Sequence, residues 1–280
     1  MDKRVQAQKA ALLKKLHQGP KILVLANAWD VISARIVEEI GFPAVATTSA
    51  GVAATLGYPD GQRVSREEML EVVARIARAV EVPVTADLEA GYGTTPSQMA
   101  DTARALIAAG AVGLNLEDMT GDEETSQVDT ALQMEKIQAI QEAAAAAGVP
   151  LVLNARTDIY LMPIGPPETR LERTIERLGA YATAGADCVF APGVREPQTI
   201  AKLVAGCKVP LNILMMPGGP SLDELERIGV ARASIGSGLM RATLGRARSL
   251  ARAMFERRDD QSLFAETVPY AEVNRLLGRT

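Results

Sequence analysis

Eight short apolar runs, separated by stretches of helical character, constrain the fold of this 280-residue chain more than any other feature. The runs are rich in Val, Ile, Leu and Ala, and few polar residues interrupt them. Continuous runs of this kind are typical of strands that are buried on both faces of a parallel sheet. They lie in KILVLANAWD, GFPAVATT, EVPVTADLE, AGAVGLNLED, GVPLVLNARTD, AGADCVFAPG, KVPLNILMMP and GVARASIG.

The segments between these runs carry the signals of helix ends. Ser65, Thr95 and Ser221 are each followed three residues later by Glu or Gln, which is the spacing of a capping box. Glycines at 110, 148, 185 and 229 follow expected helix ends. Strands that alternate with helices over about 250 residues predict a (β/α)8 TIM-type barrel. An open doubly wound sheet is the second choice, because no G-x-G-x-x-G follows the first strand.

Length and composition fit one soluble domain over residues 1–280. We expect a leading helix at 1–20, the barrel at 21–245 and C-terminal helices at 246–280. The net charge of −4 gives no reason to expect nucleic acid or an anionic membrane as a partner. No apolar run approaches the length of a membrane span or a signal core, so we expect a cytoplasmic protein.

Three residues with potentially reactive side chains have simple structural explanations. Cys188 and Cys207 match neither a disulfide framework nor a zinc site, and we expect both to be buried small hydrophobes. His17, the single histidine, lies in the leading helix away from every strand end, and we expect it on the surface.

Polar residues gather where the predicted strands end, and barrel enzymes carry their functional groups at that edge. Four carboxylates from three loops would meet there without any His or Cys, a donor set that suits Mg²⁺ or Mn²⁺. Arg156 would bind a substrate carboxylate, and the stretch SAG offers a hydroxyl and slim backbone for an anion. The carboxylates are Asp60, Asp87, Glu89 and Glu117, SAG is Ser49, Ala50 and Gly51, and Trp29 and Asn212 lie at other strand ends.

Some of these residues have simpler explanations. Asp30 can cap the helix that follows it, and Trp29 can belong to the core. Asp158 can pair with Arg156 or cap a helix. Asp87 taken alone can be a buried structural acid. The set as a whole is harder to explain in this way than any of its members.

The motifs NAWD, TTSAG, LGYPDG, ADLEAGYG, NLED and NARTD occur here in an order that resembles the isocitrate lyase/phosphoenolpyruvate mutase superfamily. The resemblance runs from about residue 21 to about residue 247. It implies a (β/α)8 barrel that exchanges its eighth helix between the subunits of a homodimer or homotetramer. It also implies Mg²⁺-dependent chemistry on 2-oxo or 2-hydroxy carboxylic acids through an enolate-like state.

The resemblance implies roles for the residues already singled out. Asp87 would bind the metal directly, and Asp60, Glu89 and Glu117 would reach it largely through water. Arg156 would hold the substrate. Ser49, Ala50 and Gly51 would form the cradle for the carboxylate, and Trp29 would be a wall of the pocket. Apart from the resemblance, we also expect Asp87 and Asn212 to contact the substrate.

Two departures from the superfamily narrow the reaction. The K-[KR]-C-G-H loop of its lyases is replaced by EDMTGDEETSQVD, and F-P-E is replaced by FAPG. Isocitrate cleavage and phosphoenolpyruvate mutation are therefore disfavoured. The sequence predicts a lyase that breaks a carbon–carbon bond, or a decarboxylase, acting on a small oxo or hydroxy di-acid. The alternatives are P–C bond chemistry and a non-catalytic binder of 2-oxo acids.

The predicted catalytic residues are Arg156, Tyr92 and Glu117. Cleavage of a substituted malate would need a base, for which Tyr92 is the nearest candidate and Asp118 or Asp122 are weaker ones. The loop at 118–129 has almost nothing apolar to bury. The resemblance implies that this loop closes over the substrate.

Overall fold

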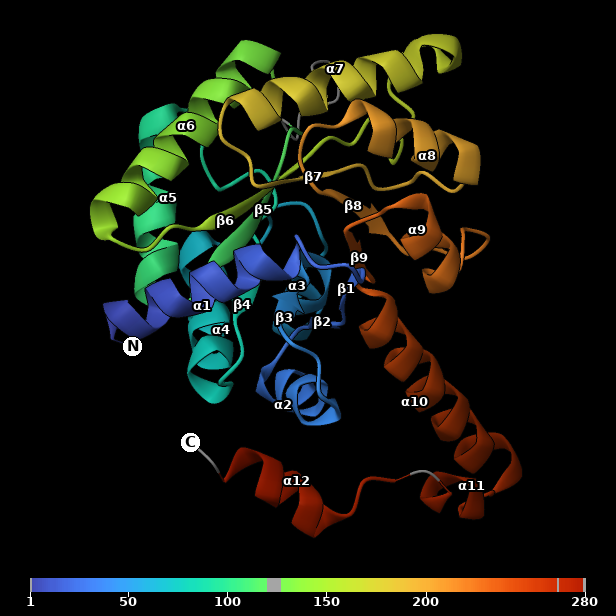
Figure 1. Cartoon of the computed structure of the whole chain (residues 1–280). Helices are drawn as coiled ribbons and strands as arrows, with labels where there is room; N and C mark the ends of the chain where they lie inside the picture. The colour runs from blue at the N-terminus through green and yellow to red at the C-terminus, as the bar shows by residue number, and fades with distance from the viewer. Residues whose placement is uncertain (1, 120–126, 266, 279–280) are drawn as a thin grey trace.

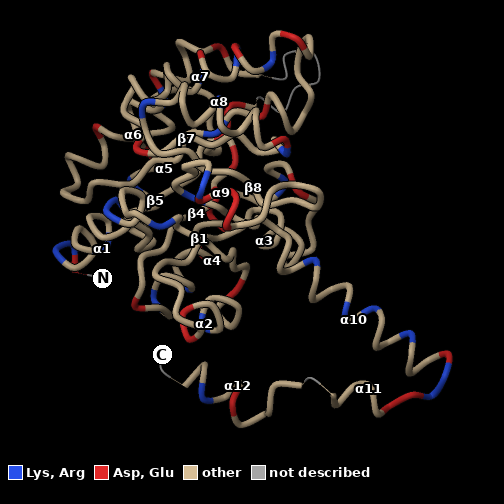
Figure 2. Tube along the Cα trace, turned by 45° about the vertical axis from the view of Figure 1, so that its right-hand side comes forward, with Lys and Arg blue, Asp and Glu red and all other residues tan. Residues whose placement is uncertain are grey.

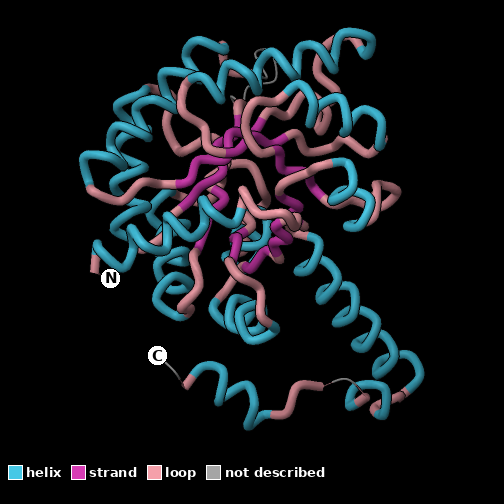
Figure 3. Tube along the Cα trace, viewed as in Figure 1, coloured by secondary structure: helices cyan, strands magenta, loops and turns pink. Residues whose placement is uncertain are grey.

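The computed structural model describes residues 2–119, 127–265 and 267–278. Their strands form one parallel sheet in the order β1-β9-β8-β7-β6-β5-β4-β3-β2, which curls into a barrel with the helices outside it (Figures 1 and 3). The strands are β1 (Leu23–Leu25), β2 (Asn27–Ala28), β3 (Val45–Thr47), β4 (Val84–Asp87), β5 (Gly113–Glu117), β6 (Val152–Arg156), β7 (Cys188–Phe190), β8 (Leu211–Leu214) and β9 (Arg232–Ser234). The predicted TIM-type barrel is confirmed.

The first apolar run forms two strands instead of one. β1 pairs with β9, and β2 pairs with β3, so the two halves of the run close the barrel from opposite sides. Ala26 lies between them and belongs to neither ladder. The eight predicted runs therefore become nine strands in the described residues without any change of topology.

The helices begin and end largely where the sequence signals lie. They are α1 (Lys3–Leu16), α2 (Val31–Ile40), α3 (Ser49–Leu56), α4 (Arg66–Ala79), α5 (Pro96–Ala109), α6 (Thr130–Ala147), η1 (Pro167–Thr169), α7 (Arg170–Thr183), α8 (Pro197–Gly206), α9 (Leu222–Ile228), α10 (Gly238–Arg257), α11 (Gln261–Phe264) and α12 (Tyr270–Leu277). Ser65 and Thr95 form reciprocal capping boxes, whereas Ser221 accepts a bond from the Glu224 N–H. Asp30 caps α2, which confirms the simpler explanation given for this residue.

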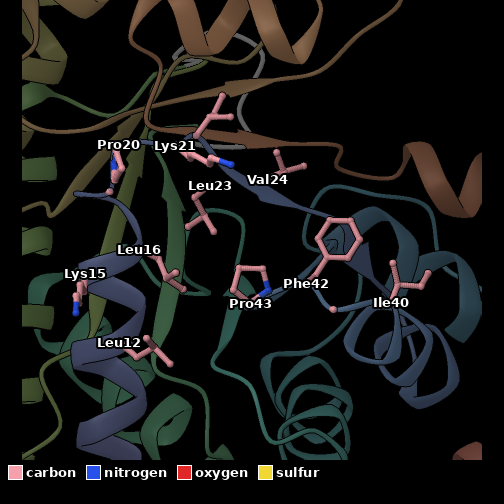
Figure 4. A pocket seen from close by; sticks show the side chains of 13 residues that line it. Leu12, Lys15, Leu16, Pro20, Lys21, Leu23, Val24, Ile40, Phe42 and Pro43 are labelled. Atoms are coloured by element: carbon pink, nitrogen blue, oxygen red, sulfur yellow. The ribbon is translucent and has the colours of Figure 1, made fainter.

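Helix α1 covers the N-terminal end of the barrel. Its residues Ala10 and Leu13 share a buried cluster with Leu23 and Leu25 of β1 and with Val152 of β6. A cavity of about 660 Å³ lies at this end, between α1 and α2. Figure 4 shows its apolar lining. The cavity is remote from the strand ends at which polar residues gather.

His17 is buried, and the prediction that it lies on the surface is wrong. It is 5% exposed, and its Nδ1 is 2.8 Å from the Leu13 carbonyl oxygen. The expectation failed because α1 lies against the barrel instead of standing free in solvent. Burial, and next the charge of Arg232, lower the pKa of His17 from 6.5 to about 4.

The C-terminal helices form an arm. α10 projects away from the barrel, and α12 returns to lie beside α2, where Arg275 pairs with Glu39 (Figures 1 and 2). The predicted boundary at 245/246 falls inside α10. Leu244 is 55% exposed and Phe255 is 90% exposed, so the arm presents apolar side chains that this chain does not cover. No helix in the described parts of the chain is long and apolar enough to cross a membrane.

Replacement of His17 by Leu should reduce the loss of stability in acid. Unfolding takes up a proton between pH 6.5 and about 4, because the unfolded chain binds it at the higher pH. The free energy of unfolding therefore falls as the pH drops through this window. At 1.36 kcal/mol for each pKa unit, the His17 contribution is about 3 kcal/mol. Urea unfolding at pH 7 and pH 4 measures the effect, and equal pH dependence in the parent and His17→Leu would contradict it.

Candidate active site

A small polar cavity opens at the C-terminal ends of the strands. Its volume is about 170 Å³, well below that of a pocket for a drug-sized ligand. Asp60, Asp87 and Arg156 are its charged lining residues. The rest of the lining is Asn27, Thr48, Ser49, Ala50, Asn115, Leu161, Phe190, Pro192, Leu214, Ser234, Gly236 and Ser237. The cavity thus brings together residues from eight of the strands, β2 to β9, or from the loops that follow them.

Asp87 is held at the end of β4 by its neighbours in the barrel. Its Oδ2 accepts hydrogen bonds from the Ser49 hydroxyl (2.8 Å) and the Ser49 N–H (3.1 Å). Its Oδ1 faces the Asn115 side-chain amide at 3.4 Å, a long contact. Asn115 is the register partner of Asp87 on β5, which explains the approach. One carboxylate oxygen is therefore firmly bound, and the other is only weakly engaged.

Arg156 lies between two carboxylates. Its Nη1 is 2.7 Å from Glu117 Oε2, and its Nε donates to Asp158 Oδ1 at 2.7 Å. Glu117 and Arg156 are register partners on β5 and β6, so the sheet itself sets them side by side. The guanidinium also lies over the ring of Phe190, 5.8 Å from its centroid. Of the two readings for Asp158, the ion pair with Arg156 is confirmed.

Glu89 and Tyr92 form a second polar group in the loop after β4. The Tyr92 hydroxyl donates to Glu89 Oε1 at 3.1 Å, and Glu89 Oε2 accepts from the Gln62 N–H. Burial and the charge of Glu89 raise the pKa of Tyr92. A phenol that is harder to ionise and already donates to a carboxylate is poorly suited to act as a base. The left-handed backbone of Glu89 (φ 51°) is costly for a residue with a side chain, which marks this loop as constrained.

The carboxylates at this end of the barrel outnumber the positive charges beside them. Burial and then the neighbouring Asp87 raise the pKa of Asp60, and burial also raises the pKa of Glu89. Burial raises the pKa of Glu117 against the opposing effect of Arg156. Burial opposes the charge on Arg156, but Glu117 and Asp158 outweigh it and raise the pKa of that guanidinium. The site thus favours an additional cation.

The donor set fits a hard, largely hydrated divalent cation. The weakly engaged Oδ1 of Asp87 is a candidate for direct coordination, and the neighbouring side chains offer oxygen. Among the described residues, no three His, Cys, Asp or Glu side chains enclose a metal position. Glu117 pairs with Arg156, and Glu89 accepts a hydrogen bond from the Gln62 N–H. The direct role of Asp87 and the indirect roles of Asp60, Glu89 and Glu117 stay predictions.

Of the other predicted substrate contacts, two line the cavity, whereas Gly51, Trp29 and Asn212 do not. Ser49 and Ala50 line it, at the start of α3. Gly51 lies behind them, where an added Cβ would come within 2.9 Å of the Trp29 Cβ. Trp29 packs against the main core. Asn212 is fully buried and exchanges hydrogen bonds with Ser234 at 3.3 Å.

Several lining residues were not predicted as site residues. Three of them, Asn27, Ser234 and Ser237, lie at the ends of the first and last predicted strands. The expectation that functional groups follow the strand ends would therefore have found them. Phe190 and Leu161 have no signal of their own in the sequence. Residues 120–126, including Asp122, lie outside the described residues, and the expected lid over 118–129 stays a prediction. Cys188 is fully buried and away from the cavity, and burial raises its pKa to about 12.

The fold and the candidate site define this protein as a TIM barrel with carboxylates and one arginine at the C-terminal ends of its strands. Comparison with known proteins identifies its family. The family model for phosphoenolpyruvate phosphomutase matches residues 13–255. The chain therefore belongs to the phosphoenolpyruvate phosphomutase family, within the superfamily that also contains isocitrate lyase.

Individual relatives agree with this assignment. Oxaloacetate decarboxylase 2 of Pseudomonas fluorescens is 31% identical over 226 residues, which cover 79% of this chain and 74% of that protein. A candidate lyase or mutase from Burkholderia cenocepacia has a structure with a TM-score of 0.91 and 38% identity, covering 98% of this chain and 97% of the other. 2,3-Dimethylmalate lyase has a TM-score of 0.84 and 25% identity, with coverage of 96% and 94%. The relatives are lyases, mutases and decarboxylases, and this chain is an enzyme of the same superfamily.

Replacement of Asp87 by Ala should abolish the binding of Mg²⁺ while the fold survives. Changes around metal ligands typically cost 10–100-fold in affinity, so loss of the direct ligand should cost at least about 100-fold. Titration calorimetry with Mg²⁺ alone measures the loss, and circular dichroism checks the fold. Asp101→Ala, which removes an exposed aspartate paired with Arg104, is the control. If Asp87→Ala bound Mg²⁺ as well as the parent, the metal assignment would be wrong.

Proposed function

We propose that this enzyme is a Mg²⁺-dependent decarboxylase of oxaloacetate or a closely similar 2-oxo di-acid. The observation that carries the proposal is the arrangement of Arg156 beside Asp87 in a cavity of about 170 Å³. A fixed guanidinium suits a carboxylate, and the small volume suits a short acid. The similarity to oxaloacetate decarboxylases at about 30% identity supports the same substrate class.

Decarboxylation fits the side chains that are present. When the bond between C3 and C4 breaks, its electron pair moves to form the enolate of pyruvate, and C4 leaves as CO₂. Solvent can then protonate C3. No side chain has to remove a proton first. Retro-aldol cleavage of a 2-hydroxy acid does require a base, and Tyr92 is poorly suited to that role.

The residues of the chain would bind and orient the substrate. Arg156 would hold the carboxylate next to the oxo group, with Glu117 and Asp158 fixing the direction of its guanidinium. The Ser49 hydroxyl and N–H would keep Asp87 in place. A bound Mg²⁺ would supply positive charge for the oxygen on which the enolate develops.

P–C bond chemistry is the second candidate, because the matching family model is that of a phosphomutase. The local charges disfavour it. A phosphonate dianion would enter a site with Asp60 and Asp87 in its lining and one arginine to oppose them. A carboxylate carries less charge and is repelled less. A binder that does not turn over its ligand is the third candidate.

The arm formed by α10 to α12 suggests how the enzyme assembles. We propose that α10 packs against a second copy of the chain, in a homodimer or homotetramer. The support for this is the exposure of Leu244 and Phe255 on a helix that the barrel does not cover. Sedimentation velocity would show a monomer if the proposal is wrong.

The parent enzyme should release pyruvate from oxaloacetate faster than the spontaneous reaction, and only with Mg²⁺ or Mn²⁺ present. A screen that includes dimethylmalate, 2-methylisocitrate and phosphonopyruvate, with pyruvate as the readout, tests the choice of substrate. Asp87→Ala serves as the inactive control. Turnover of phosphonopyruvate alone would favour the second candidate. No turnover with any of the four acids would favour the binder.

Replacement of Arg156 by Lys should lower kcat/KM by about 100-fold, the scale of losing a positioned charge-stabilising donor. Lysine keeps the positive charge but cannot bridge Glu117, Asp158 and a substrate carboxylate with one planar group. Steady-state kinetics on oxaloacetate measure the loss. Arg104→Lys on the exposed face of α5 is the matched control. Unchanged kinetics in Arg156→Lys would exclude the proposed role.

A further inference from the structure

The carboxylate of Asp118 is fully buried just after β5 and accepts four hydrogen bonds. Its Oδ1 accepts from the Asp158 N–H at 3.2 Å. Its Oδ2 accepts from Gln127 Nε2 (3.0 Å), Arg177 Nε (2.9 Å) and the Tyr181 hydroxyl (2.7 Å). A carboxylate paired in this way is not available as a base, so the weaker catalytic reading of Asp118 has no support.

Arg177 and Tyr181 come from α7, on the outside of the barrel, and reach inwards together. Arg177 Nε is also 3.0 Å from the Tyr181 hydroxyl, and its Nη2 donates to the Val128 carbonyl oxygen. Gln127 bonds to the Thr157 hydroxyl at 3.1 Å. These contacts join α7 to the segments that follow β5 and β6, which are the two strands that carry Glu117 and Arg156.

Asp118 is linked to both carboxylates that hold Arg156. Glu117 is its neighbour in the chain, and Asp158 is held through its N–H. Rotation of the Asp118 side chain would break its hydrogen bond from the N–H of Asp158, which is one of the two carboxylate residues that pair with Arg156. Asp118 does not itself line the cavity, so an effect on Arg156 would pass through the contact with Asp158.

We propose that Arg177 and Tyr181 are positioning residues for Arg156, acting through Asp118. Removing the charge of Arg177 would leave a buried carboxylate without its counter-ion, and Asp118 would then turn towards other donors. Arg156 would lose its fixed direction while the residues around Asp87 stayed in place. The consequence for substrate binding rests on the proposed function, but the positioning of Arg156 does not.

Chemical labelling of Arg156 tests the positioning without any ligand or metal. Phenylglyoxal modification of Arg156, followed by mass spectrometry, should be about 10-fold faster in Arg177→Gln, the lower end of the usual effect of supporting contacts. Tyr181→Phe keeps the ring and removes one donor, so it should raise the rate by at least about two-fold, in line with one lost hydrogen bond. Arg173→Gln is the matched control, because Arg173 lies one turn away on α7 and bonds to Ile164 instead.

Ligand binding separates positioning from a general loss of structure. With Mg²⁺ present, calorimetry with oxalate should show affinity about 10-fold weaker in Arg177→Gln. Affinity for Mg²⁺ alone should match that of the parent. Equal losses of oxalate affinity and Mg²⁺ affinity in Arg177→Gln would overturn the inference. An unchanged rate of Arg156 labelling in both Arg177→Gln and Tyr181→Phe would also overturn it. If Arg177→Gln does not fold, Tyr181→Phe decides by the labelling test. A parent that failed to bind oxalate would contradict the proposed function, and the labelling comparison would still decide this inference.

Discussion

The ion pairs of Arg156 with Glu117 and Asp158 are the interaction on which the candidate site depends. One guanidinium is placed among five carboxylates, counting Asp60, Asp87 and Glu89 with its two partners. Both pairs are 2.7 Å long and largely shielded from solvent. Burial raises the pKa values of Asp60 and Glu89, and the neighbouring carboxylates raise them further. This charge balance supports the proposals that a cation binds here and that Arg156 selects an acidic substrate.

The register of the parallel sheet explains how these groups meet. Glu117 and Arg156 are direct partners on β5 and β6, and Asp87 is the partner of Asn115 on β5. Neighbouring parallel strands end at the same edge, so their last side chains share one space. The loops then complete the site, with Ser49 from α3 binding Asp87. The candidate site is therefore assembled from strand ends, whereas α1 packs against the opposite end of the barrel.

The sequence predicted those structural features that depend on residues close together in the chain. The capping residues Asp30, Ser65 and Thr95 act as their spacing indicated, because a cap is made within a few residues. The apolar runs became strands, and the acids that follow them came together. Long-range contacts were less visible. His17 carries no sign in its own helix that this helix lies against the barrel, and Arg177 is 59 residues from the aspartate with which it pairs.

By itself, the sequence determined the barrel, the edge at which the site forms and the oxygen-rich character of that site. The reason is that strand burial, helix caps and the order of residues along each strand are properties of neighbouring residues. Only the tertiary structure decided which groups touch. It placed Glu117 on Arg156, engaged Tyr92 with Glu89 and buried Asp118 under α7. These outcomes depend on packing between distant segments, where small shifts of a helix or loop change the partner of a charge.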